Sequence, residues 1–200
     1  MDGRVDTDAG WATWPNVVTL VRLAALPLYV WILATTEHRA LAAWLLAVLG
    51  ATDWVDGYLA RRLTQTSTVG KILDPVADRL LVATSVISVA AVGGVPWWFA
   101  TATLAREIVV SALTLILAAL GASRIDVLWW GKVSTFALMT AYPLFLLTSS
   151  PSPGSAMGVL RAASWAIGIF GLSLAWIVLL GYVRPALRAL SAGRAGRRLK

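Results

Sequence analysis

The sequence predicts an all-α integral membrane protein with six transmembrane helices and both termini in the cytoplasm. Three observations predict this fold: the composition, a series of six apolar runs, and the unequal placement of basic residues between the runs. The chain has 200 residues, of which 58% are hydrophobic, with 11 Trp and a mean hydropathy of +0.75. This composition is typical of a polytopic membrane protein rather than of a soluble core. The length allows one domain, and the absence of cysteine excludes a disulfide framework.

Each of the six apolar runs is close to the ~20 residues that a helix needs to cross ~30 Å of hydrocarbon. The runs cover about 16–35, 40–60, 72–92, 97–120, 129–147 and 159–183. Residues 1–13 carry three aspartates, a charge pattern that is wrong for a cleaved signal peptide, and they predict an N-terminal tail. Gly93–Pro96 predicts a tight turn, and the Pro- and Gly-containing stretch 149–158 predicts a loop.

The basic residues predict the orientation of the chain in the membrane. Six spans put both termini on one side, where 12 of the 17 Lys and Arg residues fall, whereas only Arg39 and Arg161 lie opposite. The positive-inside rule places the richer side in the cytoplasm, so we expect an inner-membrane protein. The chain then divides into a cytoplasmic tail (1–13), a membrane domain (14–183) and a basic cytoplasmic tail (184–200). The basic tail suits anionic lipid headgroups rather than nucleic acid, because no aromatic residues interleave with its charges.

Four aspartates flank the predicted connection between the second and third spans. Acidic and small residues recur there at helical spacing and form two predicted faces: Asp53, Asp56, Gly57 and Ala60 on one helix, and Gly70, Asp74 and Asp78 on the next. If the residues between Ala60 and Gly70 make a turn, the helices run antiparallel and the four carboxylates meet near the cytoplasmic side. Ionised carboxylates in a low-dielectric place repel one another, and bound Mg²⁺ or Mn²⁺ ions would relieve the repulsion.

Two other interpretations of these aspartates do not need a metal. Each acid could form an ion pair with Arg61, Arg62 or Arg79, or the group could relay protons. The number of carboxylates and the small residues on the same faces favour a metal site.

These residues also carry a resemblance to a known family. The pattern Asp-x-x-Asp-Gly-x-x-Ala-Arg, eight further residues, and Gly-x-x-x-Asp-x-x-x-Asp runs without a mismatch from Asp53 to Asp78. It resembles the signature of the CDP-alcohol phosphotransferase family. The resemblance implies a six-helix membrane enzyme that moves a phosphatidyl or related group from a CDP-linked donor to an alcohol and releases CMP. It also implies CDP-diacylglycerol as the donor, two bound divalent cations and a homodimer.

The resemblance implies a role for each residue of the signature. Asp53, Asp56 and Asp74 would be the main metal ligands. Asp78 would act chiefly as general base on the acceptor hydroxyl and could also touch a metal. Gly57, Ala60 and Arg61 would bind the CDP donor, the first two by leaving room for the nucleotide and the arginine by pairing with a phosphate.

Further polar residues inside the spans resemble the phosphatidylglycerol branch of the family. Asn16 and Thr19 could line the nucleotide pocket or simply begin the first helix, and Arg22 could reach an acidic partner or extend to the membrane surface. Arg106 could bind an acceptor phosphate together with Lys132. The alternatives are that a core acid neutralises Arg106 and that Lys132 anchors the membrane interface.

Two acceptors compete within this branch. Members that use glycerol 3-phosphate carry extra basic residues where this chain has Thr114 and Ser134. The missing charges favour phosphatidylglycerol as acceptor and cardiolipin as product, with glycerol 3-phosphate as the alternative. An ion-coupled transporter is a remote alternative of another class, because the acids lie near one face and no inverted repeat is visible.

Overall fold

The computed structural model describes residues 13–63, 70–119, 129–150 and 155–197, and these residues form six helices. The bounds are α1 Trp14–Thr35, α2 Arg39–Leu63, α3 Gly70–Ala91, α4 Trp97–Ala119, α5 Trp129–Leu147 and α6 Ser155–Arg197. Side chains are described for residue 13 and over 16–52, 73–116, 129–150 and 155–181. The chain groups into two compact units, Met1–Val92 and Gly93–Lys200. The predicted all-helical class is confirmed, and each predicted span corresponds to one helix.

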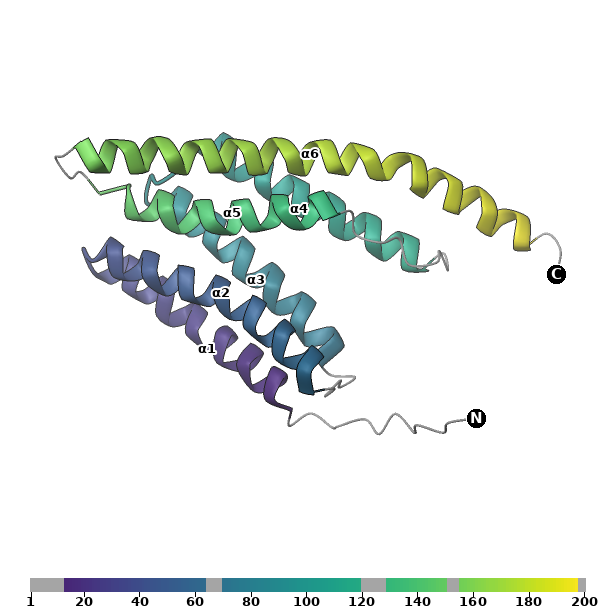
Figure 1. Cartoon of the computed structure of the whole chain (residues 1–200), viewed down its shortest axis with the longest axis horizontal. Coiled ribbons are helices and arrows are strands. Elements are labelled where there is room, and N and C mark those ends of the chain that lie inside the picture. The colour runs from purple at the N-terminus through teal and green to yellow at the C-terminus, as the bar shows by residue number, and fades with distance from the viewer. Residues whose placement is uncertain (1–12, 64–69, 120–128, 151–154, 198–200) are drawn as a thin grey trace. The chain divides into compact units, whose positions relative to one another are not determined.

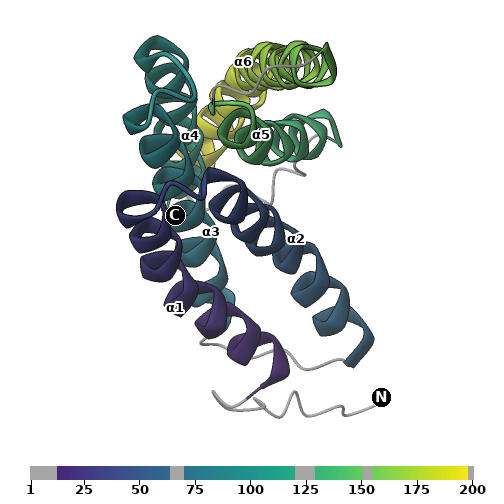
Figure 2. The same ribbon diagram turned by 90° about the vertical axis from the view of Figure 1, so that its left-hand side faces the viewer.

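The first unit contains α1, α2 and α3, with α1 packed against both of the others (Figures 1 and 2). Pro15 lies in the first turn of α1, where the missing N–H costs nothing because that group would have no helical partner. The core of the unit is built from small and branched side chains, which allow the backbones to approach closely. Its fully or almost fully buried members include Ala42, Leu46, Ala77, Val86 and Val89.

The second unit contains α4, α5 and α6, in which α6 packs along α5 and also contacts α4 (Figure 1). Close packing of α5 on α6 depends on glycine: a Cβ added to Gly168 would lie 2.7 Å from Phe145 Cζ. The ring of Phe145 itself belongs to a buried aromatic cluster with Phe99, Tyr142 and Trp165. Small residues at helix contacts are typical of membrane bundles, where van der Waals packing replaces the hydrophobic effect.

Three of the described helices are long and apolar enough to cross a membrane: Asn16–Thr35, Trp97–Ile116 and Ser155–Gly181. In helix α2 a shorter apolar stretch covers Arg39–Thr52, up to the last of the described side chains of that helix. Large apolar side chains such as Val21, Trp31 and Ile108 are exposed, as expected of helices surrounded by lipid. The protein is therefore all-helical with membrane-length helices, and the count of six spans stays a prediction.

Three boundaries can be compared with the sequence. The loop expected over 149–158 is wrong at its C-terminal end, because α6 already begins at Ser155. The tight turn expected at Gly93–Pro96 is present, and Gly93 adopts φ +76°, a conformation that residues with a Cβ rarely take. The sixth span was expected to end at 183, but α6 continues to Arg197. The residues after 183 are mostly Ala, Leu and Arg, which are strong helix formers, and the helix continues past the membrane border in spite of Pro185.

Candidate active site

The aspartate motif lies at the end of α2 and the start of α3, which are found at the same end of the first unit (Figure 1). Both segments are helical, so the spacing that puts the motif residues on shared faces applies to the backbone. The side chains of Asp53, Asp56, Ala60 and Arg61 lie outside the described ones, and so do the surroundings of Gly57 and Gly70. Asp74 and Asp78 are described, and they define the site that follows.

Asp74 accepts a hydrogen bond from helix α1. The hydroxyl of Thr19 donates to Asp74 Oδ1 over 2.7 Å, and Thr19 is fully buried. Asn16, one turn earlier on α1, is also buried. The sequence predicted Asn16 and Thr19 as nucleotide-pocket residues, and the contact now assigns the Thr19 hydroxyl to a carboxylate of the motif.

Asp78 forms an ion pair with Arg22, also on α1. Arg22 Nη1 donates to Asp78 Oδ1 over 2.7 Å. The two side chains differ sharply in exposure, 1% for Arg22 and 43% for Asp78. Of the two roles expected for Arg22, the structure shows contact with an acid. The arginines proposed from sequence as partners of the aspartates were Arg61, Arg62 and Arg79. Arg79 is exposed, the side chains of the other two lie outside the described ones, and Arg22 is a cation that contacts Asp78.

Together these contacts align α1 with α3. The pairs are Thr19 with Asp74, Arg22 with Asp78 and, farther along, Tyr29 with Ser88 at 2.7 Å. Residue numbers rise together in all three pairs, so the two helices run parallel. Because Asp74 and Asp78 both accept from α1, both carboxylates lie on the α1 side of α3. Sequence reasoning missed this pairing, although a spacing of three on α1 and four on α3 offered the signal.

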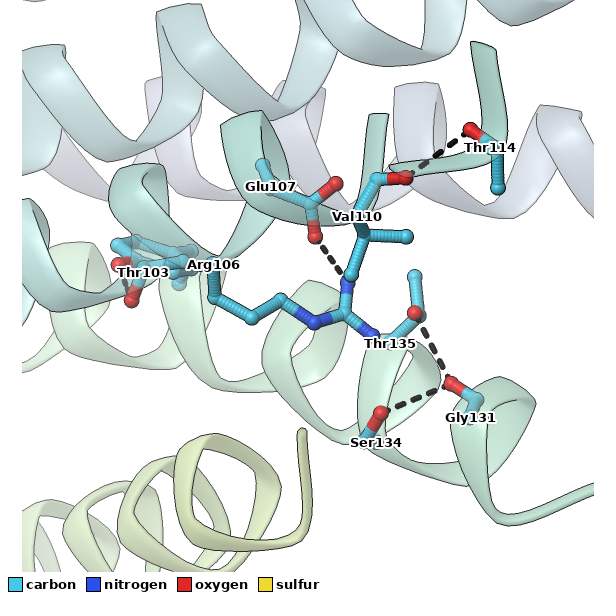
Figure 3. A network of polar contacts seen from close by, with 9 residues as sticks. Thr103, Arg106, Glu107, Val110, Thr114, Gly131, Ser134 and Thr135 are labelled. Carbon is cyan, nitrogen blue, oxygen red and sulfur yellow. Dashed lines mark hydrogen bonds and ion pairs between the residues drawn. The ribbon is translucent and has the colours of Figure 1, made fainter. Parts of the chain in front are cut away.

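A second polar cluster surrounds Arg106 on α4, in the other unit. Arg106 is 6% exposed; its Nη1 donates to the carboxylate of the adjacent Glu107. Within the described part of the chain, the buried Nε of Arg106 has no hydrogen-bond partner. The side chain points toward the first turns of α5, where the hydroxyls of Ser134 and Thr135 both donate to the carbonyl of Gly131 (Figure 3).

Three residues considered for the acceptor, Lys132, Ser134 and Thr114, differ in how far they are exposed. Lys132 is exposed, and the described residues show no contact between it and Arg106. Ser134 is fully buried, so a lysine there would need space and a partner that this packing does not offer. Thr114 is exposed, and its hydroxyl bonds only to carbonyls of its own helix, those of Val110 and Ser111.

The donor set of the motif fits a hard divalent cation, since carboxylate oxygens are the ligands that Mg²⁺ and Mn²⁺ prefer. Two such carboxylates, Asp74 and Asp78, lie one turn apart on α3 and are hydrogen-bonded from the same neighbouring helix. Among the side chains that the structure describes, no group of three or more His, Cys, Asp or Glu residues gathers. The other two predicted ligands, Asp53 and Asp56, lie outside those side chains.

Comparison with known proteins agrees with this arrangement. The model of the CDP-alcohol phosphatidyltransferase family matches residues 12–177. The chain belongs to this family. The matched region contains every residue assigned above to metal, donor or acceptor, from Asn16 to Lys132. The protein is thus a phosphatidyltransferase-family enzyme, and its membrane-length helices are those of a membrane enzyme of phospholipid synthesis.

Similar proteins include enzymes of two named kinds. The chain is 35% identical over 94% of its length to the cardiolipin synthase (CMP-forming) of Streptomyces coelicolor, covering 89% of that protein. It is 41% identical to the CDP-diacylglycerol–glycerol-3-phosphate 3-phosphatidyltransferase of Pectobacterium atrosepticum, over 68% of this chain and 77% of that one. The corresponding enzyme of Escherichia coli K12 is also 41% identical, over 64% and 72%. Both kinds of enzyme expected from the sequence are therefore named among its relatives.

Proposed function

We propose that this enzyme transfers a phosphatidyl group from CDP-diacylglycerol to phosphatidylglycerol, forming cardiolipin and releasing CMP. The observation that carries the proposal is the pair of α3 carboxylates, Asp74 and Asp78, held side by side from α1 within an intact family signature. The near full-length similarity to a CMP-forming cardiolipin synthase supports the choice of acceptor.

In this proposal the four aspartates hold two divalent cations, Mg²⁺ or Mn²⁺. Asp53, Asp56 and Asp74 are the main ligands, and Asp78 also touches one ion. When bound, the cations supply positive charge to the donor pyrophosphate and to the departing CMP. Gly57 and Ala60 leave room for the nucleotide beside α2, Arg61 pairs with a donor phosphate, and Asn16 and Thr19 border the same pocket from α1.

Asp78 acts as the general base. Its side chain is 43% exposed, so an acceptor hydroxyl can come within hydrogen-bond reach of a carboxylate oxygen. As the acceptor oxygen forms a bond to the phosphatidyl phosphorus, the bond from that phosphorus to CMP breaks. The hydroxyl proton passes to Asp78, which later returns it to water.

Arg106 binds the acceptor through its phosphate, and Lys132 adds positive charge at longer range. Arg106 already faces the carboxylate of Glu107, and Thr114 and Ser134 add no charge, so little net positive charge is available. Such a site suits a phosphodiester with one negative charge better than a phosphomonoester, which carries nearly two at neutral pH. This contrast favours phosphatidylglycerol over glycerol 3-phosphate.

Glycerol 3-phosphate is the second candidate acceptor, and one observation favours it: the enzymes named for that substrate are 41% identical to this chain over the matched region. An ion-coupled transporter is a remote alternative, which family membership disfavours.

The proposal includes six spans, both termini in the cytoplasm, an inner-membrane location, a homodimer and a site open to the cytoplasm. The orientation can be tested directly because the chain has no cysteine. Glu37→Cys should react with an impermeant maleimide outside spheroplasts, whereas Ser191→Cys should react only after permeabilisation. The reverse pattern would contradict the orientation.

The function is tested by measuring CMP release from CDP-diacylglycerol by the purified chain. Phosphatidylglycerol and glycerol 3-phosphate are supplied in parallel, each with and without a chelator. We expect chelator-sensitive release that is faster with phosphatidylglycerol. Faster release with glycerol 3-phosphate would move the acceptor to the second candidate, and no chelator-sensitive release with either would refute the proposal.

A further inference from the structure

We propose that α1 is the positioning helix of the active site: Arg22 orients Asp78, and Thr19 orients Asp74. The inference rests on the proposed function, because it gives the two α1 side chains their roles through the carboxylates of the motif. The observation behind it is a matched pair of contacts at 2.7 Å between parallel helices. Neither Arg22 nor the orienting role of Thr19 follows from the family signature, which lies wholly on α2 and α3.

The unequal exposure of the Arg22–Asp78 pair indicates positioning rather than charge burial alone. Arg22 is 1% exposed in its side chain, whereas Asp78 is 43% exposed. The guanidinium is thus hidden on the far side of the carboxylate, and it acts on the reaction through Asp78. A carboxylate needs such a contact, because the terminal torsion of an aspartate is broad and no rotamer preference fixes where its oxygens point.

A charge-assisted hydrogen bond from Arg22 restricts that torsion more strongly than a neutral donor can. General base catalysis requires the carboxylate oxygen within hydrogen-bond reach of the acceptor proton, and a misplacement of ~1 Å can cost about 10²-fold in rate. Arg22 is therefore expected to affect kcat rather than the binding of either substrate.

Thr19 has the same relation to Asp74, but with a neutral donor. Its hydroxyl is fully buried and reaches Asp74 Oδ1 from the α1 side. Hydrogen bonds to ligating carboxylates hold them in the orientation that a metal needs, and losing such a partner typically weakens metal affinity by about 10–100-fold. Replacing Thr19 changes no charge at the site. The substitution is therefore expected only to weaken cation binding, through loss of the hydrogen bond to Asp74.

The same interface contains a matched control. Tyr29 on α1 shares a hydrogen bond of 2.7 Å with Ser88 on α3, so Tyr29→Phe removes a buried contact of equal length without touching a carboxylate. The change leaves Ser88 with a partner, because its hydroxyl also donates to the carbonyl of Ser85. Loss of packing between α1 and α3 is therefore separated from loss of carboxylate orientation.

The first measurement is Mn²⁺ affinity of the full chain, followed by the EPR signal of free Mn²⁺ without donor or acceptor. We expect Thr19→Val to weaken binding by about tenfold, and Tyr29→Phe to stay within about twofold of the unmodified chain. Wild-type affinity in Thr19→Val, or equal losses in both variants, would overturn the assignment of Thr19. This measurement needs no turnover, so it decides the point even if the proposed reaction fails.

The second measurement is a steady-state comparison of Arg22→Leu and Arg22→Lys, with folding followed by thermal unfolding in detergent. We expect Arg22→Leu to lower kcat by about 10²-fold with KM for both substrates nearly unchanged, and Arg22→Lys to recover part of that loss. A merely structural role predicts instead that activity falls only with the folded fraction. Full kcat in the folded fraction of Arg22→Leu, beside an active unmodified enzyme, would overturn the role of Arg22.

Discussion

Among the side chains that the structure describes, each unit buries one arginine in an apolar helix, and the two arginines are held in different ways. Arg22 on α1 pairs with Asp78, 56 residues away on α3. Arg106 on α4 pairs with Glu107, its neighbour in sequence, and its buried Nε has no partner in the described part of the chain. The first contact links two helices, whereas the second lies within one. The difference shows which arginine joins two helices of the site and which is paired within its own helix.

At Arg106, the oxygens of an acceptor phosphate would satisfy Nε on binding. At Arg22, the charge is already matched by a carboxylate across the helix interface. We therefore treat Arg22 as part of the scaffold of the site and Arg106 as a ligand-binding residue. Four substitutions can break or sharpen this contrast.

Asp78→Asn should have the largest effect, because it removes both the proposed base and the partner of Arg22. We expect kcat to fall by about 10²–10⁴-fold, while binding of CDP-diacylglycerol is largely kept. Thermal stability should also fall, by less than the ~3–5 kcal/mol of a broken, fully buried pair, because Asp78 is 43% exposed. Rate and donor affinity are measured on the same preparation. Loss of donor binding would mean that Asp78 serves mainly as a metal ligand.

Arg106→Met should come next and should act on the acceptor alone. Hydrogen bonds to a charged group contribute about 1.5–3 kcal/mol, which corresponds to a loss of about 10–150-fold in kcat/KM for phosphatidylglycerol. Mn²⁺ affinity should not change, in contrast to Thr19→Val. An Arg106→Met variant with normal acceptor kinetics would show that Arg106 is neutralised by Glu107 and has no ligand role.

Gly168→Ala tests whether the second unit depends on packing rather than on charge. The new methyl would lie 2.7 Å from Phe145 Cζ and 3.2 Å from Phe99 Cζ, and both rings are buried. Overpacking of this kind costs about 1–3 kcal/mol, so the thermal unfolding midpoint should fall. Gly158→Ala is the matched control on the same helix, because nothing lies within 4 Å of its added Cβ. Equal midpoints for the two variants would contradict the close packing of α5 on α6.

Lys132→Met should have the smallest effect. Lys132 is exposed on α5, and exposed charges contribute about 0–1 kcal/mol. We expect at most a several-fold increase in KM for phosphatidylglycerol, which should vanish at high salt because screening removes interactions of exposed charges. A loss as large as that of Arg106→Met would place Lys132 in direct contact with the acceptor.

Much of this architecture could be predicted from the sequence, for identifiable reasons. The helix bounds follow from the apolar runs and from the helix-breaking residues between them. The turn at Gly93 and the start of α5 at Trp129 were both expected for this reason. The membrane border alone did not predict the end of α6, because helix propensity continues past it. The signature from Asp53 to Asp78 could be recognised because its chemistry requires fixed residue types at fixed spacing.

The contacts made by α1 could not be predicted in the same way. No acidic residue lies near Arg22 in sequence, and its pairing with Asp78 follows from the packing of α1 on α3. Thr19 looked equally suited to a nucleotide pocket, and only the helix register assigned its hydroxyl to Asp74. The state of Arg106 was likewise open, since an adjacent glutamate in a helix can point toward or away from its neighbour. Tertiary register, rather than local pattern, decides the contacts of Arg22 and Thr19.

The central claim is that the aspartates of α2 and α3 share bound divalent cations. Anomalous diffraction from crystals of the protein grown with Mn²⁺ tests it most directly. The account predicts two Mn²⁺ ions between the helices, ligated by Asp53, Asp56, Asp74 and Asp78. Crystals in which these carboxylates point apart and Mn²⁺ binds elsewhere, or nowhere, would contradict it.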